Sequence, residues 1–338
     1  MNTAWFILLG SLFIGYAVLD GIDIGIGTLH LVLGRTDKER QTNLNAIGPF
    51  WAGYEVWLVV AGGSMVAAFP HLYAVSFSGF YLVLTMVLWI LIGRGVGIEF
   101  RGHVENSMWR GLFDVLFCIS SVLLAVLFGA AVGNVVRGVP LDATGNFQGS
   151  LALALNPYSL LISLLNIALL GMHGANFLAS KTEGEQQAWA RLWANRLWVG
   201  VAALLVLATV ASFFVRPIGA NFARYPFLFV LPLLALASLA ATPYFQRRGE
   251  DGKAVYAGAV LIGSLMASAG ASLYPLLLPA LGNPDAGLTI YNSAAPRHSL
   301  ELAFITNLCG MALVIVYHVV IHRIFRGTVQ IHPGEHGY

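Results

Sequence analysis

Residues 4–32 read AWFILLGSLFIGYAVLDGIDIGIGTLHLV, which is long and apolar enough to cross a lipid bilayer as one helix. A crossing helix needs about 20 mostly apolar residues, and further runs of this kind follow along the chain. These runs cover residues 48–69, 73–98, 111–136, 157–180, 193–215, 225–245, 254–280 and 299–325. The sequence therefore predicts an all-α membrane protein with nine transmembrane helices.

The composition of the 338-residue chain agrees with this prediction. Hydrophobic residues make up 58% of the chain and charged residues 10%, whereas soluble domains carry about 25% charged residues. An ordinary soluble enzyme and a disordered chain are both excluded. The formal net charge of +2 is too small to indicate binding to nucleic acid.

The segments between the apolar runs are short, so the whole chain is predicted to form a single membrane domain. The longest segment contains Gly138, Pro140 and Gly145, which indicates a structured loop. Four runs precede this loop, which is compatible with two four-helix bundles and a peripheral ninth helix. The predicted parts are a first bundle at 1–137, the loop at 138–156, a second bundle at 157–280, the ninth helix at 299–325 and a cytoplasmic tail at 326–338.

The basic residues predict the orientation of the chain in the membrane. Of the 18 Lys and Arg residues, all but Arg137, Arg216, Arg224 and Arg297 fall on the side of the C-terminus. Because the side richer in Lys and Arg stays in the cytoplasm, the N-terminus is predicted to lie outside and the C-terminus inside. Adding or removing one span would invert the later loops and destroy this bias.

Asp20, Asp23 and Glu55 are acids inside apolar runs that contain no Lys or Arg. Such a residue at the bilayer centre costs about 2.5–3.5 kcal/mol and persists where it faces the bundle interior. Asp20 and Asp23 share a helix face, about 24 Å from Ala4, and Glu55 lies about 10 Å deep from the same side. These acids either carry protons inward from the cytoplasm or hold the fold together, and we favour the first interpretation.

Glu99 and Asp114 stand at the ends of apolar runs, close in sequence to Arg94, Arg101 and Arg110. For these two acids we favour a structural interpretation, in which they cap helices or pair with the arginines.

Glycines and prolines indicate how the helices pack and where one of them bends. Gly21, Gly25 and Gly27, beside the acids, predict that helices approach one another closely. Pro275 and Pro279 predict a kink in the run 254–280.

The histidines make a heme site conceivable. His318 and His322 are four residues apart on one helix face, and His30 and His173 could lie at a similar depth. However, His322 lies near the cytoplasmic end of its run, where a polar residue is ordinary, and the chain shows no recognisable metal or cofactor motif. We therefore expect no heme, metal or catalytic residue on this chain.

A series of short motifs occurs in a fixed order from about residue 5 to the last apolar run. The motifs are Asp20-Gly-Ile-Asp-Ile-Gly25, Asn45-Ala-Ile-Gly-Pro-Phe-Trp51, Glu55-Val-Trp57, Ser78-Gly-Phe-Tyr81, Arg94-Gly95, Phe100-Arg101, Gly133-Asn-Val-Val-Arg-Gly-Val-Pro140, Leu155-Asn-Pro157, Tyr274-Pro-Leu-Leu-Leu-Pro279 and Leu288-Thr-Ile-Tyr-Asn292. The series closely resembles subunit II of cytochrome bd-type quinol oxidases, including the cyanide-insensitive group.

The resemblance implies a complex of the bacterial cytoplasmic membrane that oxidises quinol and reduces dioxygen to water in aerobic respiration. It implies two b hemes and one heme d in subunit I, with this chain as the heme-free, pseudo-symmetric partner. A structural quinone and small accessory subunits occur in some members and stay open here. The family's proton-path acid matches Asp23, its neighbouring acid matches Asp20, and a tryptophan at the subunit interface matches Trp57.

One departure from the family pattern concerns the proton path. The family usually has Trp-Asp-Gly-Asn-Glu-Val-Trp, whereas this chain has Trp-Ala-Gly-Tyr-Glu-Val-Trp, with Ala52 in place of the aspartate. Either Glu55 with bound water takes over, or protons arrive by another route, for example within subunit I. A different class of function is a stand-alone secondary transporter in which Asp20, Asp23 and Glu55 bind a coupling ion.

Overall fold

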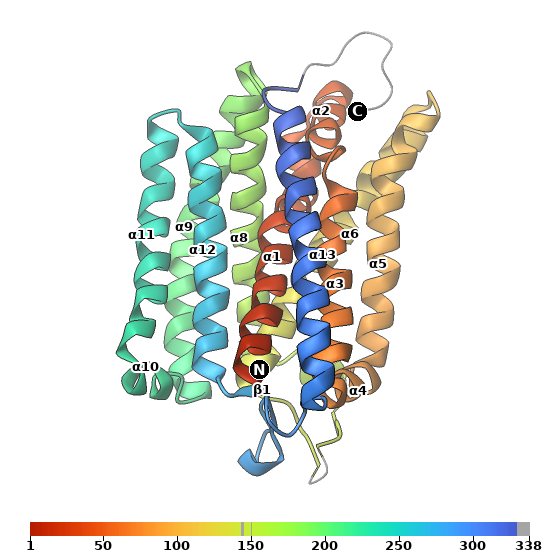
Figure 1. Cartoon of the computed structure of the whole chain (residues 1–338). Helices are drawn as coiled ribbons and strands as arrows, with labels where there is room; N and C mark the ends of the chain where they lie inside the picture. Colours follow the sequence, from red (N-terminus) through yellow and green to blue (C-terminus); the bar gives the residue numbers. More distant parts are fainter. Residues whose placement is uncertain (143–144, 150, 330–338) are drawn as a thin grey trace.

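A computed structural model of the chain describes residues 1–142, 145–149 and 151–329. Long helices run side by side, and α1 begins at one end of the bundle while α13 ends at the other (Figure 1). The α-helices of the described residues are α1 (Asn2–Leu33), α2 (Asp37–Ile47), α3 (Trp51–Ala68), α4 (Pro70–Gly79), α5 (Tyr81–Phe100), α6 (Ser107–Arg137), α7 (Leu151–Ala154), α8 (Pro157–Lys181), α9 (Gly184–Val215), α10 (Ala220–Arg224), α11 (Val230–Arg247), α12 (Asp251–Leu273) and α13 (Arg297–Ile324).

The number of crossing helices agrees with the sequence prediction. Within the described residues, eight helical segments are long and apolar enough to cross a membrane. A ninth is formed if α2 and α3, which meet at an angle of 47°, are taken as one broken span. The chain is therefore an all-α membrane protein with eight or nine candidate spans.

Two predicted spans differ from the helices in the structure. The run 73–98 is divided between α4 and α5, which are separated at Phe80. The run 254–280 is helical only as far as Leu273. The predicted kink at Pro275 and Pro279 is wrong, because both prolines lie outside the helix. A proline disfavours helical geometry at the residue before it, and Tyr274 is accordingly extended, with ψ of 133°.

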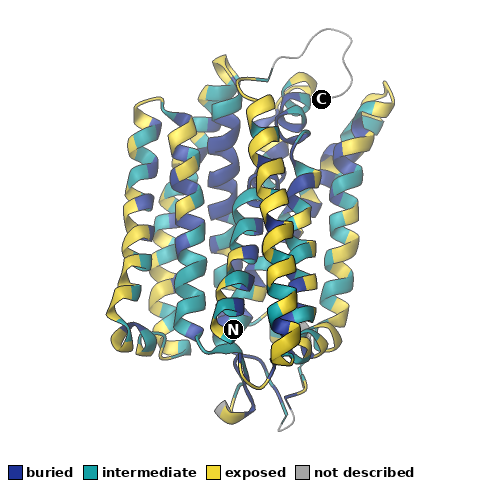
Figure 2. Cartoon of the chain, in the orientation of Figure 1, coloured by how far each residue is buried: buried dark blue, intermediate teal, exposed yellow. Residues whose placement is uncertain are grey.

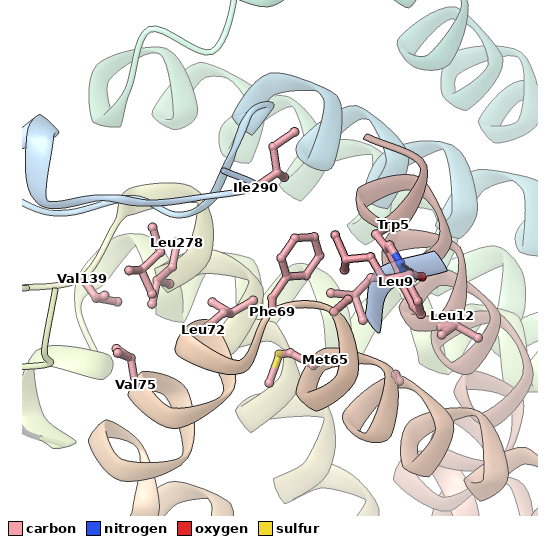
Figure 3. Close-up of a cluster of buried hydrophobic side chains, with 14 of the residues drawn as sticks. Trp5, Leu9, Leu12, Met65, Phe69, Leu72, Val75, Val139, Leu278 and Ile290 are labelled. Carbon is pink, nitrogen blue, oxygen red and sulfur yellow. Dashed lines mark hydrogen bonds between the residues drawn. The ribbon is translucent and has the colours of Figure 1, made fainter. Parts of the chain in front are cut away.

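The segment after α12 forms a small antiparallel sheet at the end of the bundle where α1 begins (Figure 1). Its strands are β1 (Leu276–Leu278) and β2 (Leu288–Thr289). Residues of this segment pack on α1, α3 and α4 in an apolar cluster that contains Trp5, Phe69 and Leu278 (Figure 3). The Trp5 indole donates a hydrogen bond to the Leu300 carbonyl at 3.0 Å, which also ties α1 to the start of α13.

Exposed side chains cover the outward faces of the long helices (Figure 2). Many of them are large and apolar, such as Phe214 at 87% exposed, Leu313 at 74% and Val59 at 73%. This pattern is typical of a surface that faces lipid. The outer side of α13 belongs to this surface, since its buried residues are limited to Leu300, Met311 and His318.

Helix α1 occupies the centre, where it packs against α3, α6, α8 and α12. Its closest approach is to α8, where a Cβ atom on Gly25 would lie 1.9 Å from the Leu170 carbonyl oxygen. A Cβ atom on Gly174 would in turn lie 2.4 Å from the Ile26 nitrogen. The prediction of close helix contacts at the glycines of α1 is therefore confirmed, and it places Asp20 and Asp23 deep inside the bundle.

Candidate functional site

Four side chains form a buried cluster, and three of them are the acids that were singled out in the sequence. The acid–arginine cluster consists of Asp20 and Asp23 on α1, Glu55 on α3 and Arg94 on α5. Nη2 of Arg94 donates a hydrogen bond to Oδ1 of Asp20 at 2.7 Å and another to Oε1 of Glu55. The side chains of Asp20 and Arg94 have no exposed surface, whereas 24% of the Glu55 side chain is exposed.

Asp23 is fully buried, and neither of its carboxyl oxygens has a hydrogen-bond partner among the residues that the structure describes. The same holds, within that part of the chain, for Oδ2 of Asp20, Nε and Nη1 of Arg94 and the Tyr16 hydroxyl. Buried polar groups without protein partners are rare and are usually satisfied by ordered water. The cluster is therefore suited to holding water molecules between its side chains.

The charges of the cluster do not balance if every group is ionised. One guanidinium faces three carboxyl groups, and an unpaired charge in the interior costs several kcal/mol. The charges balance when two of the three carboxyl groups keep a proton. The cluster can therefore store a proton and exchange it through water, which is the chemistry that a proton path needs.

A second polar network, the Asp114 network, lies at the end of the bundle where α1 ends and α2 begins. Oδ1 of Asp114 accepts a hydrogen bond from Nε of Arg101 at 2.6 Å and lies 2.8 Å from Nε2 of His30. Its Oδ2 accepts from Nη1 of Arg40 at 3.2 Å. Asp37 joins the network by accepting from Arg101 and Arg110, each at 2.7 Å.

An open cavity of about 680 Å³ reaches this network from outside. Charged side chains dominate its lining, and Asp114 is among the lining residues although only 1% of its side chain is exposed. Water in the cavity therefore reaches the rim of a buried carboxylate that is bonded to His30.

The predicted roles of the arginines are right in one case and wrong in another. The structural pairing of Asp114 is confirmed by its bonds to Arg101. Arg94, however, does not pair with Asp114 or Glu99 but with Asp20 and Glu55. The runs of Asp20 and Glu55 contain no Lys or Arg, and their basic partner comes from a different run, which the sequence analysis did not consider. Glu99 accepts a hydrogen bond from the Trp51 indole at 3.2 Å.

Trp57 is partly buried, on the side of α3 that faces α1 and α13. A Cβ atom on Gly15 would meet the Trp57 ring at 2.2 Å, and the ring lies edge-on to His318 with centroids 6.0 Å apart. The role of Trp57 at a subunit interface stays a prediction.

The histidines of α13 bond to their own helix and to α3. Nδ1 of His318 lies 2.8 Å from the Val314 carbonyl oxygen, and Nδ1 of His322 lies 2.9 Å from that of His318. Nε2 of His322 lies 3.0 Å from the Tyr54 hydroxyl, a contact that the sequence analysis missed. Being on one face of one helix, the two rings do not offer axial ligands on opposite sides of a porphyrin. Among the described residues, no group of three His, Cys, Asp or Glu side chains is placed to hold a metal ion.

Comparisons of the chain with a family model and with known proteins agree on one family. The family model described as cytochrome bd terminal oxidase subunit II matches residues 1–325. The chain is 30% identical to the cytochrome bd-I ubiquinol oxidase subunit 2 of Escherichia coli K12, over 93% of this chain and 91% of the relative. It is also 30% identical to the cytochrome bd ubiquinol oxidase subunit 2 of Bacillus subtilis, over 98% of this chain and 97% of the relative.

The fold has a counterpart among solved structures. A chain in the structure of the bd oxidase from Geobacillus thermodenitrificans superimposes with a TM-score of 0.80 at 18% identity. The match covers 96% of this chain and 98% of that chain. At this level of identity the similarity concerns the fold, and the whole bundle is shared.

Proposed function

Because the chain belongs to the cytochrome bd terminal oxidase subunit II family, we propose that its acid–arginine cluster takes up protons from the cytoplasm for the reduction of dioxygen by the oxidase complex. The chain is subunit II of a cytochrome bd ubiquinol oxidase, which is a quinol:oxygen oxidoreductase, and it is a multi-pass membrane protein. As subunit II it works in a complex with subunit I. Membership of this family argues against the alternative function, a stand-alone secondary transporter.

The observation that carries the proposal is the state of Asp23. Its carboxyl group is fully buried and has no hydrogen-bond partner among the described residues, although it shares a cluster with an arginine. A carboxyl group with a purely structural role would be expected to bond to that arginine, as Asp20 does. The unpaired position of Asp23 supports a role in accepting and releasing protons through water.

The contacts of Glu55 support the proposal that it takes over the role of the family's aspartate, which is Ala52 in this chain. Ala52 and Glu55 are three residues apart on α3 and so lie on the same side of the helix. Glu55 remains partly exposed while it bonds to Arg94. A carboxyl group that reaches both the surface and the cluster can take over the function of the missing aspartate. In this proposal Trp57 lies near the face that subunit I covers.

The remaining parts of the proposal follow from the family. Two b hemes and one heme d are held by subunit I, and this chain carries no heme of its own. Two four-helix bundles, at residues 1–137 and 157–280, form one membrane domain with the ninth helix beside them. The complex lies in the bacterial cytoplasmic membrane, and both a structural quinone and small accessory subunits are compatible with it.

The orientation of the chain can be tested with a fluorescent fusion. Green fluorescent protein attached after Tyr338 should fluoresce, because the distribution of Lys and Arg places the C-terminus in the cytoplasm, where this reporter folds. Alkaline phosphatase attached at the same place should be inactive. The reverse pattern would contradict the predicted orientation.

Asp23→Asn tests the proposed proton uptake. The amide has the shape of the carboxyl group but does not exchange protons, so turnover of the complex with saturating quinol should fall about tenfold or more. The measurement is oxygen consumption by the purified complex, normalised to its heme d absorbance, which reports assembly.

Glu301→Gln is the matched control for this measurement. Glu301 is an acid of α13 that pairs with Arg297 at the surface, with 44% of its side chain exposed. Its variant should keep full turnover. Normal turnover in the Asp23 variant, at normal heme content, would show that this chain does not supply the protons.

A further inference from the structure

The Asp114 network contacts α1 at His30, and the acid–arginine cluster includes Asp20 and Asp23 of the same helix. We infer that His30 links them and carries protons from the open cavity at Asp114 toward Asp23, with the Ser121 hydroxyl beside the route. The inference rests on the proposed function, since it names the path by which protons reach the cluster. It also gives this chain a route that does not need an acid at position 52.

The outer end of the link is the contact between His30 and Asp114. Their Nε2 and Oδ1 atoms lie 2.8 Å apart, and Asp114 lines the cavity of about 680 Å³. The His30 side chain itself has no exposed surface. Among the described residues, Asp114 therefore connects His30 to the cavity.

The second ring nitrogen of His30 is the inner end of the link. Its Nδ1 atom is buried and has no hydrogen-bond partner in the described part of the chain. An imidazole that is bonded at one nitrogen and unpaired at the other can accept a proton on one side and release one on the other. Asp23, with two unpaired oxygens, is the nearest acid further down α1.

Helical geometry places the two groups on the same face of α1. Residues 23 and 30 are two turns apart, about 10.5 Å along the axis. Gly27 lies between them, and side chains of α6 fill the space beside it. A Cβ atom on Gly27 would lie 1.9 Å from the Ser121 hydroxyl oxygen, so this hydroxyl sits against the helix at that level. About 6 Å of helix axis then separates Gly27 from Asp23, a distance that one or two water molecules span.

The surroundings of His30 are polar on the cavity side and apolar on the other. The charged groups that act on its ring are Asp114 of α6, Arg101 of the 3-10 turn after α5 and Arg40 of α2. The Phe117 ring of α6 lies edge-on with centroids 5.1 Å apart, and the Asn43 amide donates to the His30 backbone oxygen at 3.4 Å. The ring is thus held in one orientation, with one nitrogen toward Asp114.

The transfer step moves protons and no electrons. A proton from cavity water reaches the Asp114 carboxylate and passes to Nε2 of His30 while the proton on Nδ1 leaves to water beside Ser121. That water delivers a proton to Asp23. Exchange of the proton between the two ring nitrogens through water restores the starting state.

A competing route would run through α13. Nε2 of His322 lies 3.0 Å from the Tyr54 hydroxyl, and Asp23 and Asp20 act electrostatically on that hydroxyl. However, both nitrogens of His322 are engaged, since Nδ1 bonds to the His318 carbonyl. Asp114, the partner of His30, by contrast lines an open cavity. The structure therefore favours His30 over His322.

The test compares His30→Gln, His30→Ala and Ser121→Ala in the assembled complex. Glutamine can keep a bond to Asp114 but does not relay a proton, so turnover should fall about tenfold. Loss of the Ser121 hydroxyl should lower the turnover about threefold, which corresponds to the net free energy of about one hydrogen bond. Heme d absorbance should be unchanged, and added imidazole should raise the turnover of His30→Ala by filling the space of the missing ring.

His322→Gln is the discriminating control, and it should keep full turnover. Normal turnover in both His30→Gln and Ser121→Ala, at normal heme content, would overturn the inference. So would a loss in His30→Ala that imidazole does not restore, because the histidine would then have a purely structural role. If a His30 variant does not assemble, Ser121→Ala decides alone.

The Asp23→Asn variant separates this inference from the proposed function. If Asp23→Asn is slow while the His30 and Ser121 variants are normal, the cluster takes up protons by another inlet and only the inference fails. If Asp23→Asn is also normal, the proposed function itself fails.

Discussion

Replacing Arg94 with leucine should prevent assembly of most of the complex. The guanidinium is fully buried and bonds to both Asp20 and Glu55. Removing one partner of a buried ion pair costs about 3–5 kcal/mol, because the remaining charge is left without compensation. That is a large share of the stability of a typical domain. The yield of complex with heme d absorbance, and its thermal midpoint, measure the effect.

A compensating variant distinguishes charge from packing. Combining Arg94→Leu with Asp20→Asn and Glu55→Gln removes the acids that the arginine balances, so part of the lost assembly should return. Arg297→Leu is the control, because Arg297 forms a surface pair with 86% of its side chain exposed, and it should assemble normally. Assembly of Arg94→Leu at the wild-type level would show that the ion pairs do not hold the cluster together.

The second large effect is expected from Gly25→Ala. The added methyl group would lie 1.9 Å from the Leu170 carbonyl oxygen, which belongs to the backbone of α8 and cannot turn away. The two central helices would have to separate, at a cost of about 3 kcal/mol. Because Asp23 is two residues from Gly25, turnover of whatever complex assembles should fall as well. The yield and turnover are measured as for Arg94→Leu.

Gly200→Ala provides the matched control for this steric effect. Gly200 lies inside α9, and a Cβ atom there would meet nothing within 4 Å among the described residues. Alanine favours a helix more than glycine does, so this variant should be as stable as the wild type or slightly more stable. A normal yield of Gly25→Ala would contradict the close packing of α1 on α8.

Much of the architecture could be predicted because it depends on local properties of the sequence. An apolar run such as residues 4–32 has few alternatives to crossing the membrane as a helix. Acids inside such runs are expensive wherever they occur, which is why Asp20, Asp23 and Glu55 could be singled out without a structure. The interruption at Phe80 was missed, because hydropathy alone does not indicate where a helix breaks. The prolines after Leu273 were interpreted as a kink, although a proline also disfavours helical geometry at the residue before it and can end the helix there.

The partners of the acids could not be predicted, since they depend on contacts between distant parts of the chain. Arg94 is 74 residues from Asp20 and 39 from Glu55. It lies in an apolar run of its own, and this was a signal that it needed a buried acid. His30 carried a similar signal. Its partner Asp114 lies 84 residues away and had been expected to pair with arginines. His30 itself, the residue to which we now assign proton transfer, had been considered only as a heme ligand.

The anchoring of Trp5 has a consequence for biosynthesis. The bond from Trp5 to the Leu300 carbonyl spans 295 positions, and Asn2 reaches Ile290 in the same way. Chains are made from the N-terminus onward, so these two bonds of the first helix form only after most of the polypeptide has been synthesised. Until then the helix that holds Asp20 and Asp23 is secured only by its earlier neighbours. A nascent chain that stops before Ile290 would lack both bonds, so the N-terminal end of this helix would be held less firmly than in the finished subunit.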